Sequence, residues 1–348
     1  MSGMCQHESP APERPRLSVV VPCYNEEEGL ALFYGRLSAA CADCAGDAYE
    51  IILVDDGSTD RSWSIITLLA EEDPHLVGLS LSRNFGHQLA LSAGLSFARG
   101  DRVFVIDADL QDPPELLGRM MELMDGGADV VYGQRTEREG ETWFKRWSAA
   151  TFYRLLARMT DVDVPLDTGD FRLMSRRVVA ALQAMPEQHR FVRGLVAWIG
   201  FRQVALPYTR ERRAAGVTKY PIRKMLRFAI DAVTGFSVLP LRVSSLLGVC
   251  FGLLGLSALV YALISWLLFN AVPGWASTVV LTSILGGSQL LALGIMGEYV
   301  GRIFMEVKGR PHFVVREVFA GRAQREGASA PRRSPSARRG KPIRARSE

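Results

Sequence analysis

Val103-Phe104-Val105-Ile106-Asp107-Ala108-Asp109-Leu110-Gln111-Asp112 is the stretch that decides the fold class of this 348-residue chain. Its apolar first part predicts a strand buried on both faces of a parallel sheet. The carboxylates follow at the carboxyl end of that strand, where open α/β sheets bind their ligands. Oxygen ligands suit Mg²⁺ or Mn²⁺, and Mg²⁺ usually takes one or two carboxylates plus substrate phosphates. Asp107 and Asp109 are therefore predicted to hold a cation on a nucleotide diphosphate, although a solvated acidic turn would show the same pattern.

Strands alternate with helices on both sides of this stretch. Apolar runs at 17–21, 50–54, 77–80 and 129–132 predict further strands, and helical patterns lie between them. This alternation predicts a doubly wound α/β domain with a mostly parallel sheet. No G-x-G-x-x-G follows the first strand and no G-x-x-x-x-G-K-[ST] occurs, which disfavours a dinucleotide-binding enzyme and a P-loop ATPase.

Two earlier strands also end in polar residues. Asp55 and Asp56 follow the second strand and are predicted to contact uracil, ribose or a metal. An Asp-Gly turn with a capping box is the alternative, and it is less favoured because two strands of the sheet end in acids. The first strand is expected to end at Pro22, because proline cannot continue a central strand. The residues after it could cap a helix through Asn25 or form a wall for a nucleotide.

Asp170 lies in a second chemically loaded stretch, Thr168-Gly169-Asp170-Phe171-Arg172-Leu173-Met174. Its carboxylate could complete a site with Asp109, or it could be a turn residue paired with Arg172. Upstream, His87 could be a ligand, but a lone histidine near a helix start is more often a cap or a packing residue.

Two basic segments flank the predicted domain. The first, at 133–147, places cations beside aromatic residues and could bind phosphate, or it could be an amphipathic helix with a solvated basic face. The second, at 210–220, precedes the amphipathic stretch 225–240, and cations near a bilayer gain roughly 1 kcal/mol each from anionic lipid.

Residues 243–297 contain no Asp, Glu, Lys or Arg. This length exceeds the ~20 apolar residues that one membrane helix needs, and breaks near Asn270 and Pro273-Gly274 predict two spans at 244–269 and 276–297. A buried hydrophobic hairpin is the less favoured alternative. Lys and Arg lie on both flanks and not between the spans, so the α/β domain and both termini are expected to be cytoplasmic.

The sequence thus divides into six predicted segments: a disordered leader at 1–16, an α/β domain at 17–220, amphipathic juxtamembrane helices at 221–243, a two-helix membrane region at 244–300, a cytoplasmic juxtamembrane segment at 301–319, and a basic disordered tail at 320–348. The Arg-rich tail follows a membrane span, which argues against a nucleic-acid partner.

Three motifs resemble the successive signatures of glycosyltransferase family 2: Val20–Glu26, Val54–Asp60 and Asp107–Glu115. Further stretches are similar to the bacterial polyprenyl-phosphate branch, which includes undecaprenyl-phosphate glucosyltransferases and resembles dolichol-phosphate mannose synthases. These are Thr168–Leu173, Arg190–Gly194, Thr218–Pro221 and Gly297–Arg302. The processive-synthase motif Gln-x-x-Arg-Trp is absent.

The resemblance implies a GT-A nucleotide-sugar domain, followed by amphipathic interface helices and two transmembrane helices in the bacterial inner membrane. It implies inverting transfer of a hexose, with glucose from UDP-glucose as the best expectation, onto undecaprenyl phosphate at the cytoplasmic face. The alternatives are a GDP-mannose or modified-sugar transferase of the same fold and a non-catalytic membrane scaffold. It also suggests a homo-oligomer, with no number of subunits.

The resemblance assigns roles to individual residues. Asp109 would bind Mg²⁺ or Mn²⁺ together with Asp107, and Asp170 would act beside it, orienting the acceptor or the metal. The nucleotide sugar would be held by Pro22, Tyr24, Asn25, Glu26, Asp55, Asp56, Asp107, Ala108 and Gln111. The phosphates of acceptor or donor would be held by Arg135, Lys145, Arg146 and Lys219.

Overall fold

A computed structural model describes residues 14–136, 168–188, 190–209, 239–269 and 274–320 of the protein. Along the chain these form the elements β1 (Leu17–Cys23), α1 (Leu30–Ala45), β2 (Tyr49–Asp55), α2 (Ser62–Glu72), β3 (Leu76–Leu81), α3 (His87–Phe97), β4 (Arg102–Val105), the 3₁₀ turn η1 (Pro114–Leu116), α4 (Leu117–Asp125), β5 (Val130–Arg135), β6 (Thr168–Ser175), α6 (Arg176–Ala184), α7 (Val192–Ile199), β7 (Gln203–Tyr208), α9 (Leu239–Phe269), α10 (Trp275–Lys308) and β8 (Val315–Ala320).

The strands form one mixed sheet in the order β7-β5-β6-β4-β1-β2-β3-β8. The strands β4, β1, β2 and β3 are parallel, as the sequence predicted, and β7 pairs parallel with β5. The differences are β6, which is inserted antiparallel between β4 and β5, and β8, which is antiparallel to β3.

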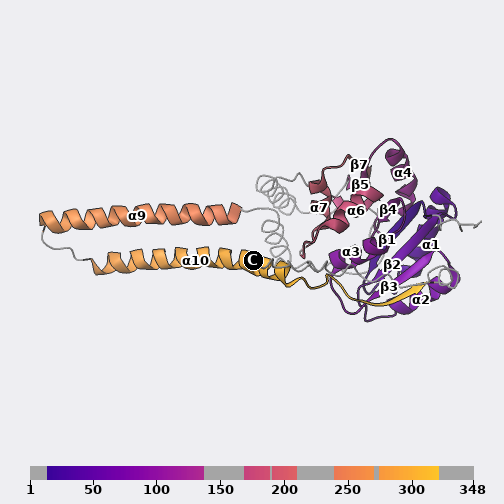
Figure 1. Cartoon of the computed structure of the whole chain (residues 1–348), viewed down its shortest axis with the longest axis horizontal. Coiled ribbons are helices and arrows are strands. Elements are labelled where there is room, and N and C mark those ends of the chain that lie inside the picture. Colours follow the sequence, from indigo (N-terminus) through magenta and orange to yellow (C-terminus); the bar gives the residue numbers. More distant parts are fainter. Residues whose placement is uncertain (1–13, 137–167, 189, 210–238, 270–273, 321–348) are drawn as a thin grey trace, which may run out of the picture.

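Helices cover both faces of this sheet (Figure 1). Val19 and Val21 of β1 pack with α1, α2 and α4 on one face, whereas Val20 packs with α3, α6 and α7 on the other. Successive strand side chains point to opposite faces, so an uninterrupted apolar run is the pattern of a strand buried on both sides. This confirms the α/β prediction.

Pro22 lies inside β1, where the sequence had predicted that the strand would already have turned. Ladder bonds of β1 alternate between its two neighbours: the carbonyl of Val20 accepts from Ile106 on the β4 side, and that of Cys23 accepts from Asp56 on the β2 side. Pro22 therefore faces β4, and the β1–β4 pairing ends at Val20. No ladder bond is lost at the proline, so β1 continues to Cys23.

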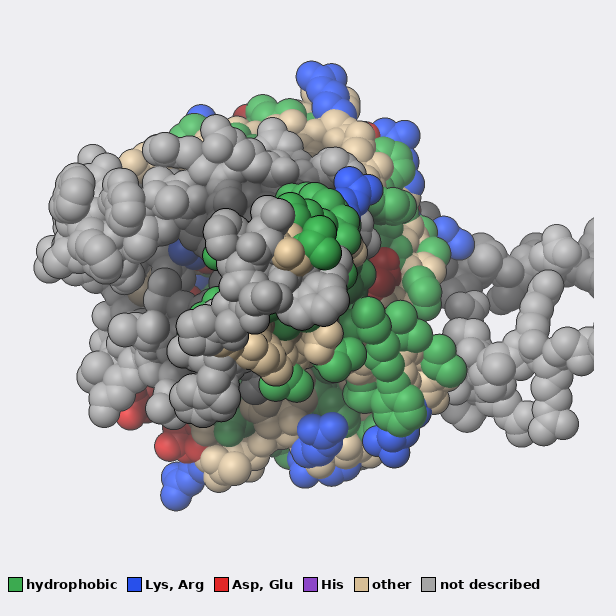
Figure 2. All heavy atoms as spheres, turned by 90° about the vertical axis from the view of Figure 1, so that its left-hand side faces the viewer, with side chains coloured by type: hydrophobic (Ala, Val, Ile, Leu, Met, Phe, Trp, Pro, Cys, Tyr) green, Lys and Arg blue, Asp and Glu red, His purple; other side chains and the backbone are tan. Residues whose placement is uncertain are grey.

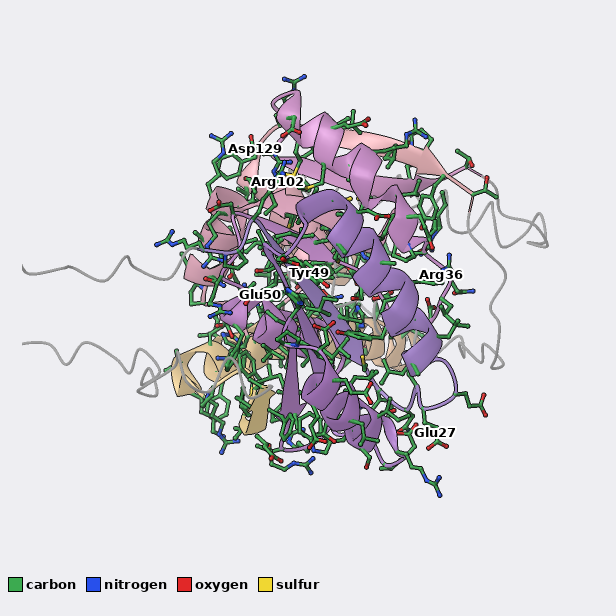
Figure 3. All side chains as sticks on the ribbon, turned by 90° about the vertical axis from the view of Figure 1, so that its right-hand side faces the viewer. Glu27, Arg36, Tyr49, Glu50, Arg102 and Asp129 are labelled. Carbon is green, nitrogen blue, oxygen red and sulfur yellow. The ribbon has the colours of Figure 1, made fainter. Side chains whose placement is uncertain are left out.

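The amino ends of the strands are fixed by a buried carboxylate, Glu50, labelled in Figure 3 at the start of β2. It accepts hydrogen bonds from Ser18 Oγ (2.6 Å), the Arg99 amide (2.7 Å) and the Arg99 guanidinium (2.6 and 2.8 Å). A buried charge is tolerated when it is paired and hydrogen-bonded in this way. The opposite, carboxyl ends of the strands are left to carry the acidic residues.

The helices α9 and α10 extend side by side from the domain (Figure 1). Pro240–Tyr261 and Val280–Lys308 are long and apolar enough to cross a membrane, and they are the two candidate spans among the described residues. Their large apolar side chains are exposed, for example Leu253, Leu267 and Leu290. Figure 2 looks at this side of the molecule and shows hydrophobic side chains gathered on it. The prediction of two such helices is confirmed, although both extend beyond the predicted spans 244–269 and 276–297.

The segment after α10 returns to the sheet, which the sequence analysis did not predict. Residues 301–319 were expected to be a juxtamembrane segment and residue 320 the start of a disordered tail. In the structure α10 continues to Lys308, and Val315–Ala320 form the edge strand β8. Phe319 packs against one face of the core and Val315 against the other, which explains why this short strand pairs with β3.

Candidate active site

The central carboxylates lie on the turn that follows β4. This strand ends at Val105, one residue earlier than predicted, so Asp107 and Asp109 are not part of an extended strand. The turn places Leu110 at a φ of 58° and is closed by a hydrogen bond from the Gln111 amide to Asp109 Oδ1 (3.2 Å). Strand alternation therefore does not decide where these two side chains point.

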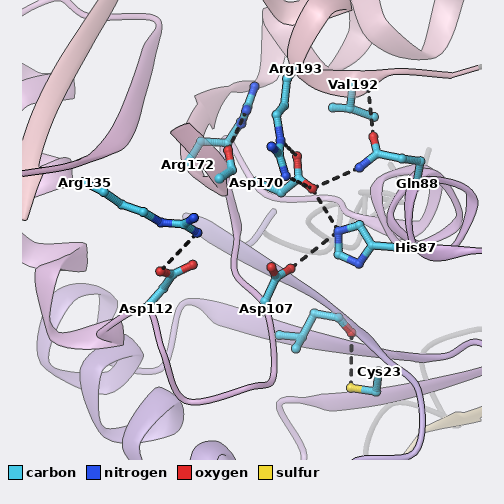
Figure 4. Close-up of polar contacts among 12 residues, drawn as sticks. Cys23, His87, Gln88, Asp107, Asp112, Arg135, Asp170, Arg172, Val192 and Arg193 are labelled. Atoms are coloured by element: carbon cyan, nitrogen blue, oxygen red, sulfur yellow. Dashed lines mark hydrogen bonds and ion pairs between the residues drawn. The ribbon is translucent and has the colours of Figure 1, made fainter. Parts of the chain in front are cut away.

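Asp170 of β6 is the centre of a hydrogen-bonded cluster beside this turn (Figure 4). Its carboxylate accepts from Arg193 through Nε (2.9 Å) and Nη2 (3.2 Å), and from Gln88 Nε2 (2.9 Å). The ring of His87 completes the set, with Nε2 at 2.9 Å from Oδ2. The Val192 amide donates to Gln88 Oε1 (3.0 Å), so α3, β6 and α7 are held together at one point.

The charges of this cluster shift the pKa values of Asp170 and His87 so that both charged forms are favoured. Asp170 is only 1% exposed, and burial raises its pKa. The charge of Arg193 and the hydrogen bond with His87 outweigh that effect and hold the pKa of Asp170 well below its usual range. Burial lowers the pKa of His87, but its bond to Asp170 and the charge of Asp107 raise it above its ordinary value. Asp170 is thus an ionised anchor with its acceptor sites filled.

Asp107 differs from Asp170 in its surroundings. Burial raises the pKa of Asp107 to about 6, and the nearby carboxylates of Asp170, Asp112 and Asp109 add to this, against the influence of His87. Its Oδ1 is buried, lies 3.5 Å from His87 Nε2, and has no hydrogen-bond partner among the described residues. A buried carboxylate oxygen without a hydrogen bond is costly, so this atom suits a cation.

The residues present fit a divalent metal ion that takes only one or two of its ligands from the protein. Within the described ranges, no group of three or more His, Cys, Asp or Glu side chains is arranged to hold a metal ion. The turn offers the oxygens of Asp107 and, two residues later, of Asp109. One or two carboxylates are what Mg²⁺ usually takes from a protein when substrate phosphates supply further ligands.

A second polar cluster lies on the far side of the turn. The Tyr208 hydroxyl donates to Asp112, Arg135 Nε donates to the same hydroxyl (3.3 Å), and Arg135 Nη2 is 3.8 Å from Asp112. Behind it, Arg172 is buried and donates to the Gly169 carbonyl (3.0 Å). Burial lowers the pKa of Arg172 to about 10, against the influence of Asp170. Cations therefore stand on two sides of the acidic turn.

The predicted nucleotide-binding residues of β1 and β2 form a connected pair of loops. Asn25 has a φ of 55°. Its side-chain Oδ1 accepts a hydrogen bond from the backbone amide of Thr59 (2.9 Å), and its backbone amide donates to Ser58 Oγ (3.0 Å). Asp56 is buried and accepts hydrogen bonds from the backbone amides of Phe85 and Gly86 (2.7 and 2.9 Å). Asp55 is also buried and has no exposed surface. Both acids hold loops in this structure, and direct contact with a nucleotide stays a prediction.

Comparison with known proteins settles the family. The sequence model of Glycosyl transferase family 2 matches residues 18–182. An uncharacterized glycosyltransferase of Bacillus subtilis, YkcC, is 46% identical over 303 residues, which cover 87% of this chain and 94% of that protein. The chain belongs to glycosyltransferase family 2.

A further relative of this glycosyltransferase carries a more specific name. The SfII prophage-derived bactoprenol glucosyl transferase of Shigella flexneri is 38% identical over 307 residues, covering 88% of this chain and 99% of that protein. Among solved structures, the mannosyltransferase PcManGT from Pyrobaculum calidifontis, in complex with GDP-Man and Mn²⁺, is similar at a TM-score of 0.42 and 18% identity, with 86% of each chain covered.

The glycosyltransferase domain thus has the GT-A fold that the sequence predicted, followed by two helices that could span a membrane. The structure brings Asp107 and Asp170 together around His87, with Arg135 nearby (Figure 4). Asp109 lies close enough for its charge to act on Asp107. The other predicted site residues differ in exposure: Pro22 and Ala108 are buried, Glu26 and Gln111 half-buried, and Tyr24 and Asn25 exposed. Lys145, Arg146 and Lys219 lie outside the described residues.

Sequence reasoning missed the partners of Asp170. It offered Arg172 as one possible partner of this carboxylate, whereas Arg193 and Gln88 donate hydrogen bonds to it, and it favoured a cap or packing role for His87. These residues come from α3, β6 and α7, and His87 and Arg193 are 106 positions apart in the sequence. The match of Arg190–Gly194 to the family branch was the one signal that marked Arg193.

Proposed function

We propose that this protein is a membrane-bound inverting glycosyltransferase that moves glucose from UDP-glucose onto polyprenyl phosphate, with undecaprenyl phosphate as the acceptor. The observation that carries the proposal is the acidic edge of Asp107, Asp109 and Asp170 on a domain attached to two membrane-length helices. The name of the Shigella flexneri relative, a bactoprenol glucosyl transferase, supports both the sugar and the lipid.

The acceptor supplies its own nucleophile in this reaction. A phosphate monoester has its second pKa near ~6, so at neutral pH it is largely a dianion and needs no strong base to attack the sugar. Direct attack on the anomeric carbon inverts its configuration. Asp170, whose oxygens are filled by Arg193, Gln88 and His87, serves to fix those side chains around the reacting groups instead of accepting a proton.

The two acids of the turn have the complementary role toward the donor. Asp107 and Asp109 would hold Mg²⁺ or Mn²⁺, which, when bound, acts as a Lewis acid that stabilises negative charge on the departing UDP. The loops of Tyr24–Glu26 and Asp55–Asp56 form the wall for the nucleotide, and Gln111 closes the turn that carries Asp109.

Cations complete the site for a substrate with several phosphates. Arg135 is 24% exposed beside the turn, and arginine and lysine both bind phosphate. Lys145, Arg146 and Lys219 are proposed as further phosphate ligands on sequence grounds. The membrane helices keep the enzyme at the cytoplasmic face of the inner membrane, where a lipid-borne phosphate is presented to it. A homo-oligomer stays a prediction.

A transfer assay tests the function directly. Purified full-length protein in detergent receives undecaprenyl phosphate, Mn²⁺ or Mg²⁺, and separately UDP-glucose, UDP-galactose, UDP-N-acetylglucosamine or GDP-mannose, and lipids are analysed by mass spectrometry. We expect a hexosyl-phosphate lipid from UDP-glucose that disappears with EDTA. Product from another donor alone would replace the sugar and keep the mechanism. Absence of both product and donor binding would favour a scaffold.

A further inference from the structure

Arg316 connects the segment that follows the second long helix to the interior of the catalytic domain. It lies on β8, the edge strand beside β3 in Figure 1. Its Nη2 donates a 2.7 Å hydrogen bond to Oγ of Ser80, a residue of β3 with no exposed surface. An exposed strand residue thus places its guanidinium on a buried hydroxyl.

The Ser80 hydroxyl passes this contact to Asp55. Ser80 Oγ donates to Asp55 Oδ2 over 3.2 Å, and Asp55 is fully buried at the carboxyl end of β2. A guanidinium has donors only, so Ser80 must accept from Arg316, and its single hydrogen is left to point at Asp55. Arg316 therefore fixes the direction in which the hydroxyl donates.

Asp55 in turn holds the loop that faces the predicted nucleotide site. Its Oδ1 accepts from the Ser58 amide (3.1 Å), and Ser58 Oγ accepts from the Asn25 amide (3.0 Å). An unbroken series of hydrogen bonds thus runs from β8 through β3 and β2 to the loop after β1. We call Arg316, Ser80, Asp55, Ser58 and Asn25 the relay.

The segment that carries Arg316 is held at several points. Gln188, in the loop before α7, donates its amide to Glu306 Oε1 (2.7 Å) and its side chain to the Arg310 carbonyl (2.8 Å). The Ser82 amide donates to the Val314 carbonyl (2.9 Å), one residue before β8 begins. The end of α10 is therefore fixed to the catalytic domain, and β8 is a defined support for the relay.

We propose that Arg316 is a positioning residue for donor binding: through Ser80 and Asp55 it orders the Asn25–Ser58 loop pair that receives the nucleotide diphosphate. This inference rests on the proposed function. It makes the affinity for the donor depend on the strand that follows the membrane helices, about 230 residues downstream of β3. Without Arg316 the Ser80 hydroxyl is free to rotate, and the loop loses its fixed support.

The experiment compares UDP affinity, measured by isothermal titration calorimetry with Mn²⁺, for full-length protein in detergent and for Arg316→Ala. We expect the Kd to rise about 10-fold, the scale of one charged hydrogen bond, with kcat at saturating UDP-glucose changing less than about two-fold. Glu317→Ala truncates the exposed neighbour on the same strand and is the matched control. Arg316→Lys, which keeps a donor, should recover part of the affinity.

Ser80→Ala and the double variant separate the relay from simple loss of edge-strand stability. If the relay acts as a unit, Ser80→Ala raises the Kd by a similar factor and the double variant adds little to it. A Kd of Arg316→Ala equal to that of Glu317→Ala, or fully additive effects, would overturn the inference even if thermal stability falls. If the wild-type protein binds none of UDP, GDP, ADP and TDP, the proposed function fails and the inference falls with it.

Discussion

Arg193 is the cation that compensates the almost fully buried charge of Asp170. Truncation of one partner of a buried ion pair leaves an uncompensated charge, so we expect Arg193→Ala to destabilise the protein by about 3 kcal/mol. Transfer should also fall, because His87 and Gln88 lose their common anchor. Thermal unfolding in detergent and the transfer assay measure both effects. Arg119→Ala, at an exposed position of α4, is the control, and equal melting temperatures for the two variants would contradict the prediction.

Asp109 should behave in the opposite way, because it is half-buried on a turn and serves the substrate more than the fold. Asp109→Asn keeps the shape and removes the charge, so we expect transfer to fall by about 100-fold or more. The melting temperature should stay within a degree or two of the wild-type value. Asp43→Asn, at an exposed acid on α1, provides the comparison. Transfer by Asp109→Asn at the level of Asp43→Asn would exclude the metal role.

For single residues, the sequence shows which residue types lie at the ends of strands, but it does not show which side-chain atoms contact one another. Asp107 and Asp109 could be predicted to lie at the ligand-binding edge because they follow an apolar strand of a parallel sheet. Asp170 could only be offered as a possible partner of Asp109, because it precedes its apolar run and lies on an antiparallel strand. The choice of Arg193 over Arg172 as the partner of Asp170 could not, since it depends on how α7 packs against α3. Asp55 was predicted to face the nucleotide, and its complete burial becomes visible only once β3 and β8 cover it.

The contact of α3 with the sheet depends on Gly94. A Cβ at this position would lie 2.3 Å from Val20 Cγ1 and 2.9 Å from Val54 Cγ2. Both valines are buried on the central strands, so Gly94→Ala should destabilise the domain by about 1–3 kcal/mol through overpacking. Intrinsic-fluorescence melting of the full-length protein in detergent measures this change.

Gly35 of α1 is the matched position, because a Cβ there would meet nothing within 4 Å. Alanine has the higher helix propensity, so Gly35→Ala should stabilise the protein by about 0.5–1 kcal/mol. The two substitutions are chemically identical and are expected to move the melting temperature in opposite directions. A melting temperature that also rises in Gly94→Ala would show that α3 can move away from the sheet at little cost.

Among the elements, the local ones could be predicted and the distant pairings could not. The parallel strands β1 to β4 stand out because each is a short apolar run followed by a helix. The strand β8 is a six-residue segment that pairs with β3 across more than 230 positions, and its two adjacent charged residues, Arg316 and Glu317, also suit an exposed segment. Pro22 misled the prediction of the end of β1 because its missing N–H faces β4 beyond the last β1–β4 pair, and the sequence does not show where that pairing stops.

For the whole molecule, the return of the chain from α10 into the sheet restricts how the two long helices can cross a membrane. Since β8 pairs with β3, the end of α10 lies beside the catalytic domain, and we expect both outer ends of the helix pair to lie on the same side of the membrane. Two membrane crossings, one by each helix, would return the end of α10 to the side of the catalytic domain, whereas a single crossing would leave it on the opposite side. The basic residues at both outer ends of the helix pair agree with it.

Reporter fusions in a bacterial host check this orientation. Alkaline phosphatase, which is active only outside the cytoplasm, is inserted after Pro273, between the helices, and we expect it to be active. The same enzyme fused after Glu348 should be inactive, whereas green fluorescent protein at that position should fluoresce. The reverse pattern would place the acidic site away from cytoplasmic nucleotide sugars. Activity at both positions would contradict the two crossings that we expect from the pairing of β8 with β3.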